Sequence, residues 1–467
     1  MANQNILTYG LKVSQLKQDY FSPSVFLANS TTPVESLYCF LSRVDPWPYD
    51  SNPPAPTQDQ QYIKNVFKNM FVAKAITSNN ITPVARRIDW TSGQVYDYYQ
   101  DNVDMLAVDQ NDFLIKSFYI KNRYDQVFKC LWNNNGAQAT VEPFFQPGNY
   151  NTNNVFTGSD GYKWKYLYTI DIGSKIKFMD STWIPVPLGQ NTPNPLSSTP
   201  GIGSIDVVNV TNGGSGYDPA NSFITVTITG DGSGASANAV VSNGQITDII
   251  VGTPGTNYSH ANVTIQTANS LIGSGATAIA PASPIGGHGF DPVSELGCNH
   301  VMFSVEFNGP ESLLGVNYVP TDIDYRQIGI LINPMDEYTY PYFANNSIYD
   351  LTTHFTVASG FGVYTSDETV VQVDVNSSSP TFGQTVFSAT VLSFNTSTNV
   401  LYLINTSGTP LIGSTVTGLS SKTSRTLLVS TPPTIVPFSG YIAYIENRSG
   451  VQRSLDGIEQ FKFVLGY

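Results

Sequence analysis

The chain has 467 residues, of which 41% are hydrophobic and 12% aromatic, so it holds enough apolar material for several folded domains and is not a disordered polymer. Only 12% of the residues are charged, and the formal net charge is −13. Binding to nucleic acid needs a basic face that neutralises phosphates, which these totals do not supply. The composition therefore argues against nucleic acid and anionic membranes as main partners.

The chain shows no membrane-spanning or secretory pattern. No apolar run approaches the roughly 18 residues needed to cross a bilayer, and the N-terminal segment lacks the basic and apolar stretches of a signal peptide. Cys39, Cys130 and Cys298 lie far apart and form no Cys-x-x-Cys pair. We expect buried free thiols in a chain made in a reducing cytoplasm.

The first clear element is a helix that follows the proline-rich segment 53–56. Thr57 and Gln60 have the spacing of a capping box, and one apolar face follows them, made of Ile63, Phe67, Met70 and Phe71. Farther along, alternating residues predict half-buried strands at 112–116, 126–132, 162–168 and 301–307. A short helical turn is expected after Asp291-Pro292.

Charge is distributed unevenly along the chain. The first 177 residues hold 16 of the 22 Lys and Arg, and all five tryptophans precede position 190. The segment 187–200 has four prolines and no charge, which is typical of an extended linker. We therefore expect a change of domain there.

The segment 203–282 contains an internal repeat of about 41 residues. Tyr217 and Tyr258 occupy matching places, as do the Gly-Ser-Gly-Ala runs 232–235 and 273–276. The segment has four aspartates and no Lys, Arg or Glu. Its alternating β-branched runs and glycine turns predict two copies of one antiparallel β unit that form one small domain.

A second β-rich segment covers 367–432. Four alternating runs are separated by Ser, Thr, Gly and Asn: 370–375, 385–392, 399–404 and 426–429. This pattern predicts a compact barrel or sandwich of about five strands.

Enzyme motifs are weak throughout. Cys298 and His300 share one face of a strand and are interpreted as a structural pair, and the glycine-rich runs 230–235 and 286–289 as turns. The acidic pairs Asp322/Asp324 and Asp367/Glu368 are interpreted as surface acids. For Arg86 and Arg87 we expect one arginine to pair with a carboxylate and the other to stack on an aromatic ring. We predict no catalytic residue, metal or cofactor.

Five stretches carry a common signature in chain order. They contain Arg43, Pro46 and Trp47; Arg86, Arg87, Asp89 and Trp90; Asp160, Gly161, Tyr162, Trp164 and Tyr166; Arg326, Gln327, Asn333 and Pro334; and Glu446, Asn447 and Arg448. Together they resemble the dimeric wedge subunit of T-even-like phage baseplates. In that family the two arginines run directly into Asp-Trp, whereas here Ile88 stands between them.

The resemblance covers 1–190, 284–365 and 433–467. It implies a mainly β fold with minor α, in which a discontinuous layered β-sandwich core carries helices on its loops. The repeat segment 203–282 and the segment 367–432 lie outside the resemblance and are interpreted as two small inserted all-β domains.

The resemblance also implies a structural protein without enzymatic activity. The expected role is a homodimer in the tail baseplate of the virion, which links other wedge proteins, extends to tail-fibre attachment proteins, and moves as a rigid body on tail contraction. An alternative is a tail receptor- or glycan-binding module, in which the inserted β domains, with Tyr217, Tyr258, Asn and Asp near turns, offer stacking faces for sugars. A polysaccharide hydrolase is a further alternative and needs two carboxylates roughly 5–10 Å apart.

Overall fold

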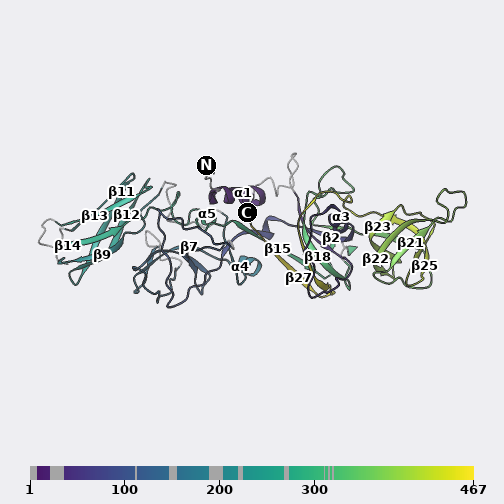
Figure 1. Cartoon of the computed structure of the whole chain (residues 1–467), viewed down its shortest axis with the longest axis horizontal. Helices are drawn as coiled ribbons and strands as arrows, with labels where there is room; N and C mark the ends of the chain where they lie inside the picture. The colour runs from purple at the N-terminus through teal and green to yellow at the C-terminus, as the bar shows by residue number, and fades with distance from the viewer. Residues whose placement is uncertain are drawn as a thin grey trace. The chain divides into compact units, whose positions relative to one another are not determined.

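The computed structural model describes residues 8–21, 36–110, 113–146, 155–188, 203–218, 224–267, 273–309, 311–313, 316–317 and 320–466. Strands account for 46% and helices for 8%, so the fold is mainly β with minor α, as expected. The chain divides into two compact units (Figure 1). Unit 1 comprises 1–18, 82–302 and 463–467, and unit 2 comprises 19–81 and 303–462. The domain boundaries derived from the sequence stay predictions, and most of the expected linker 187–200 lies outside the described residues.

Unit 1 is organised around a four-stranded antiparallel sheet. Its order is β4 (Tyr119–Lys121), β5 (Gln126–Asn133), β7 (Tyr162–Thr169) and β6 (Val155–Thr157). All eight residues of β5 are buried, and so are six of the eight in β7. The prediction of half-buried strands is therefore wrong here. One face packs against an aromatic cluster that contains Phe128, Tyr162 and Trp164, and the other carries lysines that are covered by carboxylates.

Shorter elements complete the core of unit 1. They are β3 (Ile81–Arg86), which pairs with β8 (Trp183–Pro185), and the helices α1 (Tyr9–Phe21), α4 (Ile172–Phe178) and α5 (Pro292–Glu295). The expected turn after Asp291 is confirmed, because the Asp291 carboxylate caps α5. The strand predicted at 112–116 is wrong for its described part. There only Leu114 forms an isolated bridge, while the ring of Phe113 lies against Arg86.

The repeat segment forms one six-stranded antiparallel sheet, which we call the repeat sheet. Its order is β12 (Gln245–Thr256), β11 (Ser233–Ser242), β10 (Ile224–Gly230), β13 (Ala261–Thr267), β14 (Ser274–Ile279) and β9 (Asn209–Ser215). The first half of the repeat comprises β9, β10 and β11, and the second comprises β12, β13 and β14, so the strand order is symmetric about the β10–β13 pair. The equivalent pairs Ser233↔Thr256 and Ser274↔Ser215 show that the first strand of each half pairs with the last strand of the other half.

The repeated tyrosines Tyr217 and Tyr258 each contact a strand of the other half of the repeat. The hydroxyl of Tyr217 accepts a hydrogen bond from the backbone N–H of Ala276 at 3.2 Å, and that of Tyr258 from Ala235 at 3.4 Å. Tyr217 is 4% exposed and Tyr258 2% exposed. The hypothesis that their rings offer stacking faces for sugars is therefore wrong, because both rings lie in the core of the repeat sheet.

Unit 2 contains a five-stranded antiparallel sheet that is covered by a helix. The sheet order is β19 (Ile348–Asp350), β2 (Met70–Ala75), β1 (Leu37–Ser42), β18 (Asp324–Ile332) and β26 (Tyr441–Gln452). Unit 2 also contains β16 (Ser312–Leu313), β17 (Val316–Asn317) and most of β15 (His300–Asn308) and β27 (Ile458–Gly466). Every residue of β1 is buried.

The predicted helix exists but begins and ends elsewhere. α3 runs from Gln60 to Asn69, and its N-cap is Asp59, whose carboxylate accepts a hydrogen bond from the N–H of Tyr62 at 2.8 Å. Thr57 instead donates its hydroxyl hydrogen to Asp59. The capping box at Thr57 is thus wrong, because an ionised carboxylate accepts N–H bonds more strongly at the positive end of a helix. Met70 already belongs to β2.

The second β-rich segment is a closed barrel of six strands. Its order is β20 (Thr353–Val357), β23 (Val400–Gly408), β22 (Thr385–Asn395), β21 (Thr369–Val373), β24 (Thr415–Gly418) and β25 (Ser424–Thr431). β20 precedes the range 367–432 and closes the barrel by pairing with both β23 and β25. The interior is filled by apolar side chains such as Phe355, Phe387 and Leu401.

The pairing of strands from different halves of the repeat predicts that two glycines with positive φ differ in how well they tolerate substitution by alanine. A Cβ on Gly214 (φ +62°) would meet the carbonyl oxygen of Ser274 at 2.4 Å, whereas one on Gly234 (φ +82°) would meet nothing closer than 3.8 Å. Gly214→Ala should lower the free energy of opening measured for amides of β9 and β14 by about 3 kcal/mol. Gly234→Ala should lower the free energy of opening measured for amides of β11 by about 1 kcal/mol. Native-state hydrogen exchange on the full chain measures both, and equal losses would contradict this pairing of strands.

Candidate functional site

In unit 2 the signature residues of three stretches meet in one polar network. The indole N–H of Trp47 donates to the carbonyl oxygen of Arg448 at 2.7 Å. The side-chain amide of Gln327 donates to both Asn447 and the hydroxyl of Tyr62, each at 2.9 Å. That hydroxyl in turn donates to Asn447 at 2.8 Å. The network ties together β18, β26, α3 and the loop before α3.

Two signature arginines lie beside this network with their carboxylate partners. The guanidinium of Arg43, 8% exposed, contacts Asp324 at 2.6 Å and binds both carboxylate oxygens of Asp367, at 2.7 and 2.5 Å. Arg326 pairs with Asp324 and with Asp50, and its hydrogen bond lowers the pKa of Asp50. Asp324 and Asp367 are therefore ion-paired, and each acts as a partner of a buried arginine.

The other signature positions of unit 2 shape turns and strand ends. Asn333 has a φ of +53° and accepts the N–H of Ser36 at 2.8 Å, while the carbonyl of Pro334 accepts the N–H of Ala344. Glu446 accepts a hydrogen bond from the guanidinium of Arg448. Pro46 is exposed in the loop that carries Trp47.

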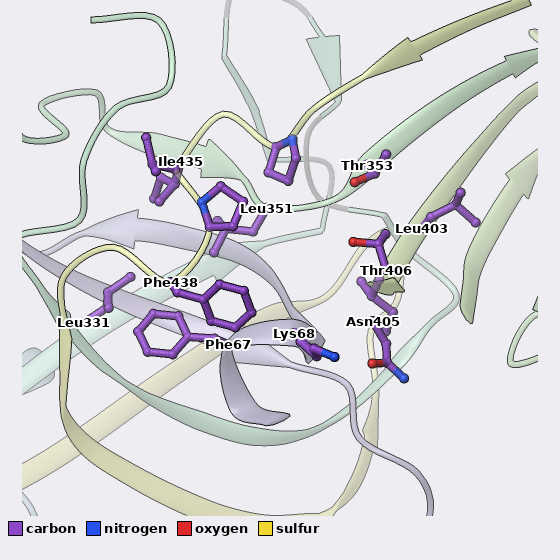
Figure 2. Close-up of a pocket in the computed structure, with 14 residues that line it drawn as sticks. Phe67, Lys68, Leu331, Leu351, Thr353, Leu403, Asn405, Thr406, Ile435 and Phe438 are labelled. Atoms are coloured by element: carbon purple, nitrogen blue, oxygen red, sulfur yellow. The ribbon is translucent and has the colours of Figure 1, made fainter. Parts of the chain in front are cut away.

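Unit 2 also has a small pocket of about 80 Å³ between α3 and the barrel (Figure 2). We call it the α3–barrel pocket. Its walls come from α3, β18, the barrel strands β20 and β23, and the segment that follows the barrel. The lining residues are Phe67, Lys68, Leu331, Leu351, Thr353, Leu403–Thr406, Pro433 and Ile435–Phe438. No sequence motif marks this pocket, because its walls are far apart along the chain.

In unit 1 the two consecutive arginines of the signature separate as expected. Arg87 binds both carboxylate oxygens of Asp89, at 3.1 and 3.0 Å, and donates to the carbonyl of Asp180 at 2.7 Å. The guanidinium of Arg86 lies 3.6 Å from the ring centroid of Phe113 and also faces Trp183. The prediction of one carboxylate pair and one aromatic stack is confirmed.

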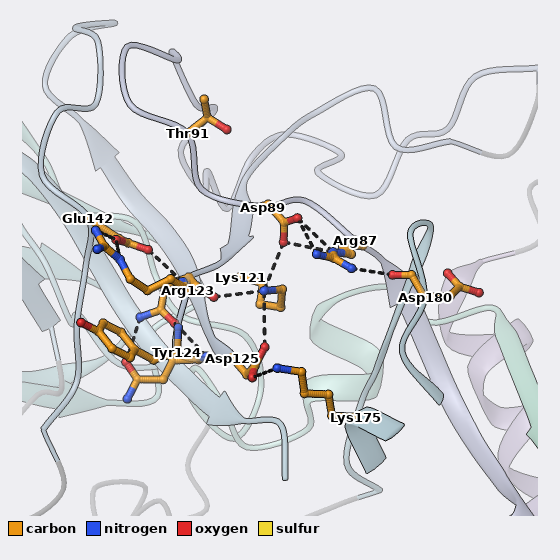
Figure 3. Close-up of polar contacts among 12 residues, drawn as sticks. Arg87, Asp89, Thr91, Lys121, Arg123, Tyr124, Asp125, Glu142, Lys175 and Asp180 are labelled. Atoms are coloured by element: carbon orange, nitrogen blue, oxygen red, sulfur yellow. Dashed lines mark hydrogen bonds and ion pairs between the residues drawn. The ribbon is translucent and has the colours of Figure 1, made fainter. Parts of the chain in front are cut away.

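Asp89 begins a chain of alternating charges (Figure 3). Lys121, whose side chain is 7% exposed, lies 3.3 Å from Asp89 and 3.5 Å from Asp125, and Lys175 of α4 reaches Asp125 at 2.6 Å. The backbone N–H of Trp90 donates to the carbonyl of Lys121 at 2.9 Å. The signature stretch is thereby fixed to the β4–β5 turn and to α4.

The remaining stretch of unit 1 builds a turn and an aromatic face. Asp160 accepts two backbone N–H groups across the turn, from Thr140 at 2.7 Å and Val141 at 2.9 Å, and Gly161 has a φ of +81° that suits glycine. The rings that follow pack in pairs: Tyr162 on Trp164, with centroids 5.5 Å apart, and Tyr166 on Phe145 at 4.1 Å. The signature positions therefore form two groups, one in each unit.

Sequence reasoning missed the lysine face of the β5–β7 sheet. Lys165 pairs with Asp206 at 2.9 Å, and Lys163 pairs with Asp248 at 2.7 Å and also donates to the carbonyl of Val208. Both aspartates belong to the repeat segment, which has no Lys, Arg or Glu. The uneven charge along the sequence was the available signal, because a lysine-rich core and a domain with only acidic charge can complement each other.

Lys129 on the same face joins a buried cluster of three ionisable groups. Its ammonium lies 2.9 Å from Glu295, and Nδ1 of His288 lies 2.6 Å from the same carboxylate oxygen. We assign the ring proton to Nδ1, which then donates to Glu295. Burial and the charge of Lys129 lower the pKa of His288. Burial raises the pKa of Glu295, but Lys129 and His288 outweigh it and hold that pKa well below its usual range.

The cysteines that the sequence analysis considered for chemistry are buried, and the acids Asp324 and Asp367 both bind Arg43. All three cysteines are buried free thiols, as expected, and burial raises the pKa of Cys298, which disfavours a nucleophilic thiolate. His300 packs against the ring of Trp183. In the part of the chain that the structure describes, no three His, Cys, Asp or Glu side chains are arranged to hold a metal ion. Within the same described ranges, no helix has the length and apolar character needed to cross a bilayer.

Comparison with known proteins adds no family assignment. No protein-family model matches the chain, and no curated protein matches it. The likeness to the baseplate wedge family therefore rests on the signature residues themselves.

The buried histidine predicts a loss of stability in mild acid. The pKa of His288 is lower in the folded chain than in the unfolded chain, where it lies near 6.5. The free energy of unfolding should therefore fall as the pH drops below about 6.5, by up to about 1.4 kcal/mol per pH unit. Urea unfolding followed by tryptophan fluorescence reports on unit 1, which holds four of the five tryptophans.

A matched variant isolates the contribution of His288. Between pH 7 and 5, His288→Gln should show a shallower loss of stability than the wild type, because the substitution removes the group whose pKa differs between the folded and unfolded chain. Equal slopes for the wild type and His288→Gln would contradict a lowered pKa of His288 in the folded chain.

Proposed function

We propose that the protein is a structural subunit of the baseplate wedge of a contractile-tail phage. In this role it links neighbouring wedge proteins as a homodimer and shifts as a rigid body when the tail contracts. Its location is the tail baseplate of the virion, and its partners are other wedge proteins and tail-fibre attachment proteins.

The observation that supports the proposal most is the convergence of the signature residues. Trp47 and Arg448 are 401 positions apart in the sequence, yet they share a hydrogen bond. Arg43, Gln327 and Asn447 lie in the same unit with their polar groups satisfied by partners that are also distant in sequence. Residues that a family shares because they hold its fold are expected to behave in this way, since their loss would leave buried polar groups unpaired.

The buried charge pairs agree with a structural role. Lys129, Lys163, Lys165 and Arg43 all direct their charges at carboxylates within the chain. A subunit that assembles once and stays assembled needs modules with fixed orientations, and buried pairs of this kind are sensitive to orientation. For the alternative glycan-binding role, the rings of Tyr217 and Tyr258 are buried and offer no face for a sugar.

The proposal predicts where the protein is found on virus particles. Antibody raised against the full chain and coupled to gold should label intact particles from the producing host only at the end of the tail away from the head, in a ring around the tube. Negative-stain electron microscopy measures the label, and pre-immune antibody is the control. Label along fibres, or particles without label, would contradict the baseplate assignment.

A further inference from the structure

The α3–barrel pocket has the size of a single side chain. Its volume of about 80 Å³ is far below the roughly 300–1,000 Å³ of sites that hold cofactors or drug-sized ligands. Its floor is apolar and buried, with Leu331 and Leu403 at 0% and Ile435 at 4% exposed. The pocket therefore suits one aliphatic group.

The mouth of the pocket combines aromatic rings with polar groups. Phe67 and Phe438 have ring centroids 5.9 Å apart, and Phe438 is 51% exposed. Figure 2 shows these rings on one side of the pocket and the side chains of Asn405 and Thr406 on the other. Lys68 also lines the mouth, is exposed, and has no carboxylate partner among the described residues.

The wall that carries Phe438 is fixed in place. Ile435 forms a β-bridge with Asp336, and the N–H of Val436 donates to the carbonyl of Met335 at 2.9 Å. The loop that begins at Asp336 displays three exposed tyrosines: Tyr338 at 70%, Tyr340 at 65% and Tyr342 at 73%. Its start is held by Asp336, which is 3% exposed and accepts the N–H groups of Tyr338 and Thr339.

Exposed tyrosines on a loop whose first residue, Asp336, pairs with the pocket residue Ile435 are typical of a protein-binding surface. Tyrosine is enriched where proteins meet, because it offers a large contact area at a low cost in side-chain entropy. A preformed pocket that accepts one anchor side chain is the usual form of an energetic hot spot. The cation at the mouth favours an acidic neighbour for that anchor.

We propose that the α3–barrel pocket binds an extended segment of a partner protein, which inserts one leucine or isoleucine side chain and places a flanking aspartate or glutamate beside Lys68. The proposal does not depend on the baseplate role. It identifies the partner by chemistry alone, as an aliphatic anchor flanked by carboxylates.

The test uses the full chain with ¹³C-labelled isoleucine methyl groups and short blocked peptides. The probe is acetyl-Gly-Asp-Leu-Asp-Gly-amide, titrated at low ionic strength and followed by the methyl resonance of Ile435 in the pocket. The reference methyl belongs to Ile172, which is 78% exposed in unit 1 and should not shift. Replacing the leucine of the peptide by alanine should weaken binding about tenfold or more, and replacing both aspartates by lysines about threefold or more.

Variants of the protein separate the two parts of the proposal. Lys68→Glu should weaken binding of the acidic peptide about threefold, whereas Lys64→Glu, one turn earlier on α3 and outside the pocket, should leave it unchanged. Thr406→Trp should fill the mouth and abolish the shift of Ile435. Both lysines are exposed, so the lysine comparison stands even if the tryptophan variant folds poorly.

Three outcomes would overturn the proposal. The first is the absence of an Ile435 shift with any of the peptides. The second is equal affinity for the acidic and the lysine peptides, which would remove the role of Lys68. The third is a change from dimer to monomer in Thr406→Trp, measured by sedimentation equilibrium, because it would assign the pocket to a second copy of this chain.

Discussion

The pairing of buried lysines with carboxylates is the interaction on which unit 1 depends most. Lys129 and Lys165 lie directly opposite each other on β5 and β7, so their like charges would repel if nothing stood against them. Glu295 comes from α5 and Asp206 from the repeat segment, and each lies 2.9 Å from its lysine. The sheet can therefore bury this face only when α5 and the repeat segment are packed against it. The folding of the core of unit 1 thus depends on the position of the repeat sheet.

Local patterns allowed much of the fold to be predicted. The repeat was predicted because Tyr217 and Tyr258 mark turns that recur at a fixed spacing, and short alternating runs identified most barrel strands. The burial of those tyrosines was not predictable in the same way, because each ring packs under a strand from the other half of the repeat. The predicted capping box of α3 was wrong for a local reason, since Asp59 caps the helix and Thr57 donates its hydroxyl hydrogen to Asp59.

In the candidate site, too, contacts between residues close in sequence were predicted, whereas contacts between residues far apart in sequence were not. The separate roles of Arg86 and Arg87 followed from residue chemistry and neighbouring residues. The cluster of Lys129 with Glu295 joins positions 166 apart, and the α3–barrel pocket joins residues of α3 to residues beyond the barrel. No spacing rule connects such positions, and only the uneven distribution of charge along the chain indicated that the lysines needed acidic partners elsewhere.

A double-mutant cycle at Lys165 and Asp206 tests whether buried charge pairs fix the repeat sheet to the core of unit 1. Native-state hydrogen exchange of β12 amides in the full chain would give opening free energies for Lys165→Met, Asp206→Asn and the double variant. We expect a coupling energy of about 2 kcal/mol or more, because each single change leaves a buried charge or carboxamide without its partner. A coupling energy below about 0.5 kcal/mol, the size found for independent sites, would contradict it.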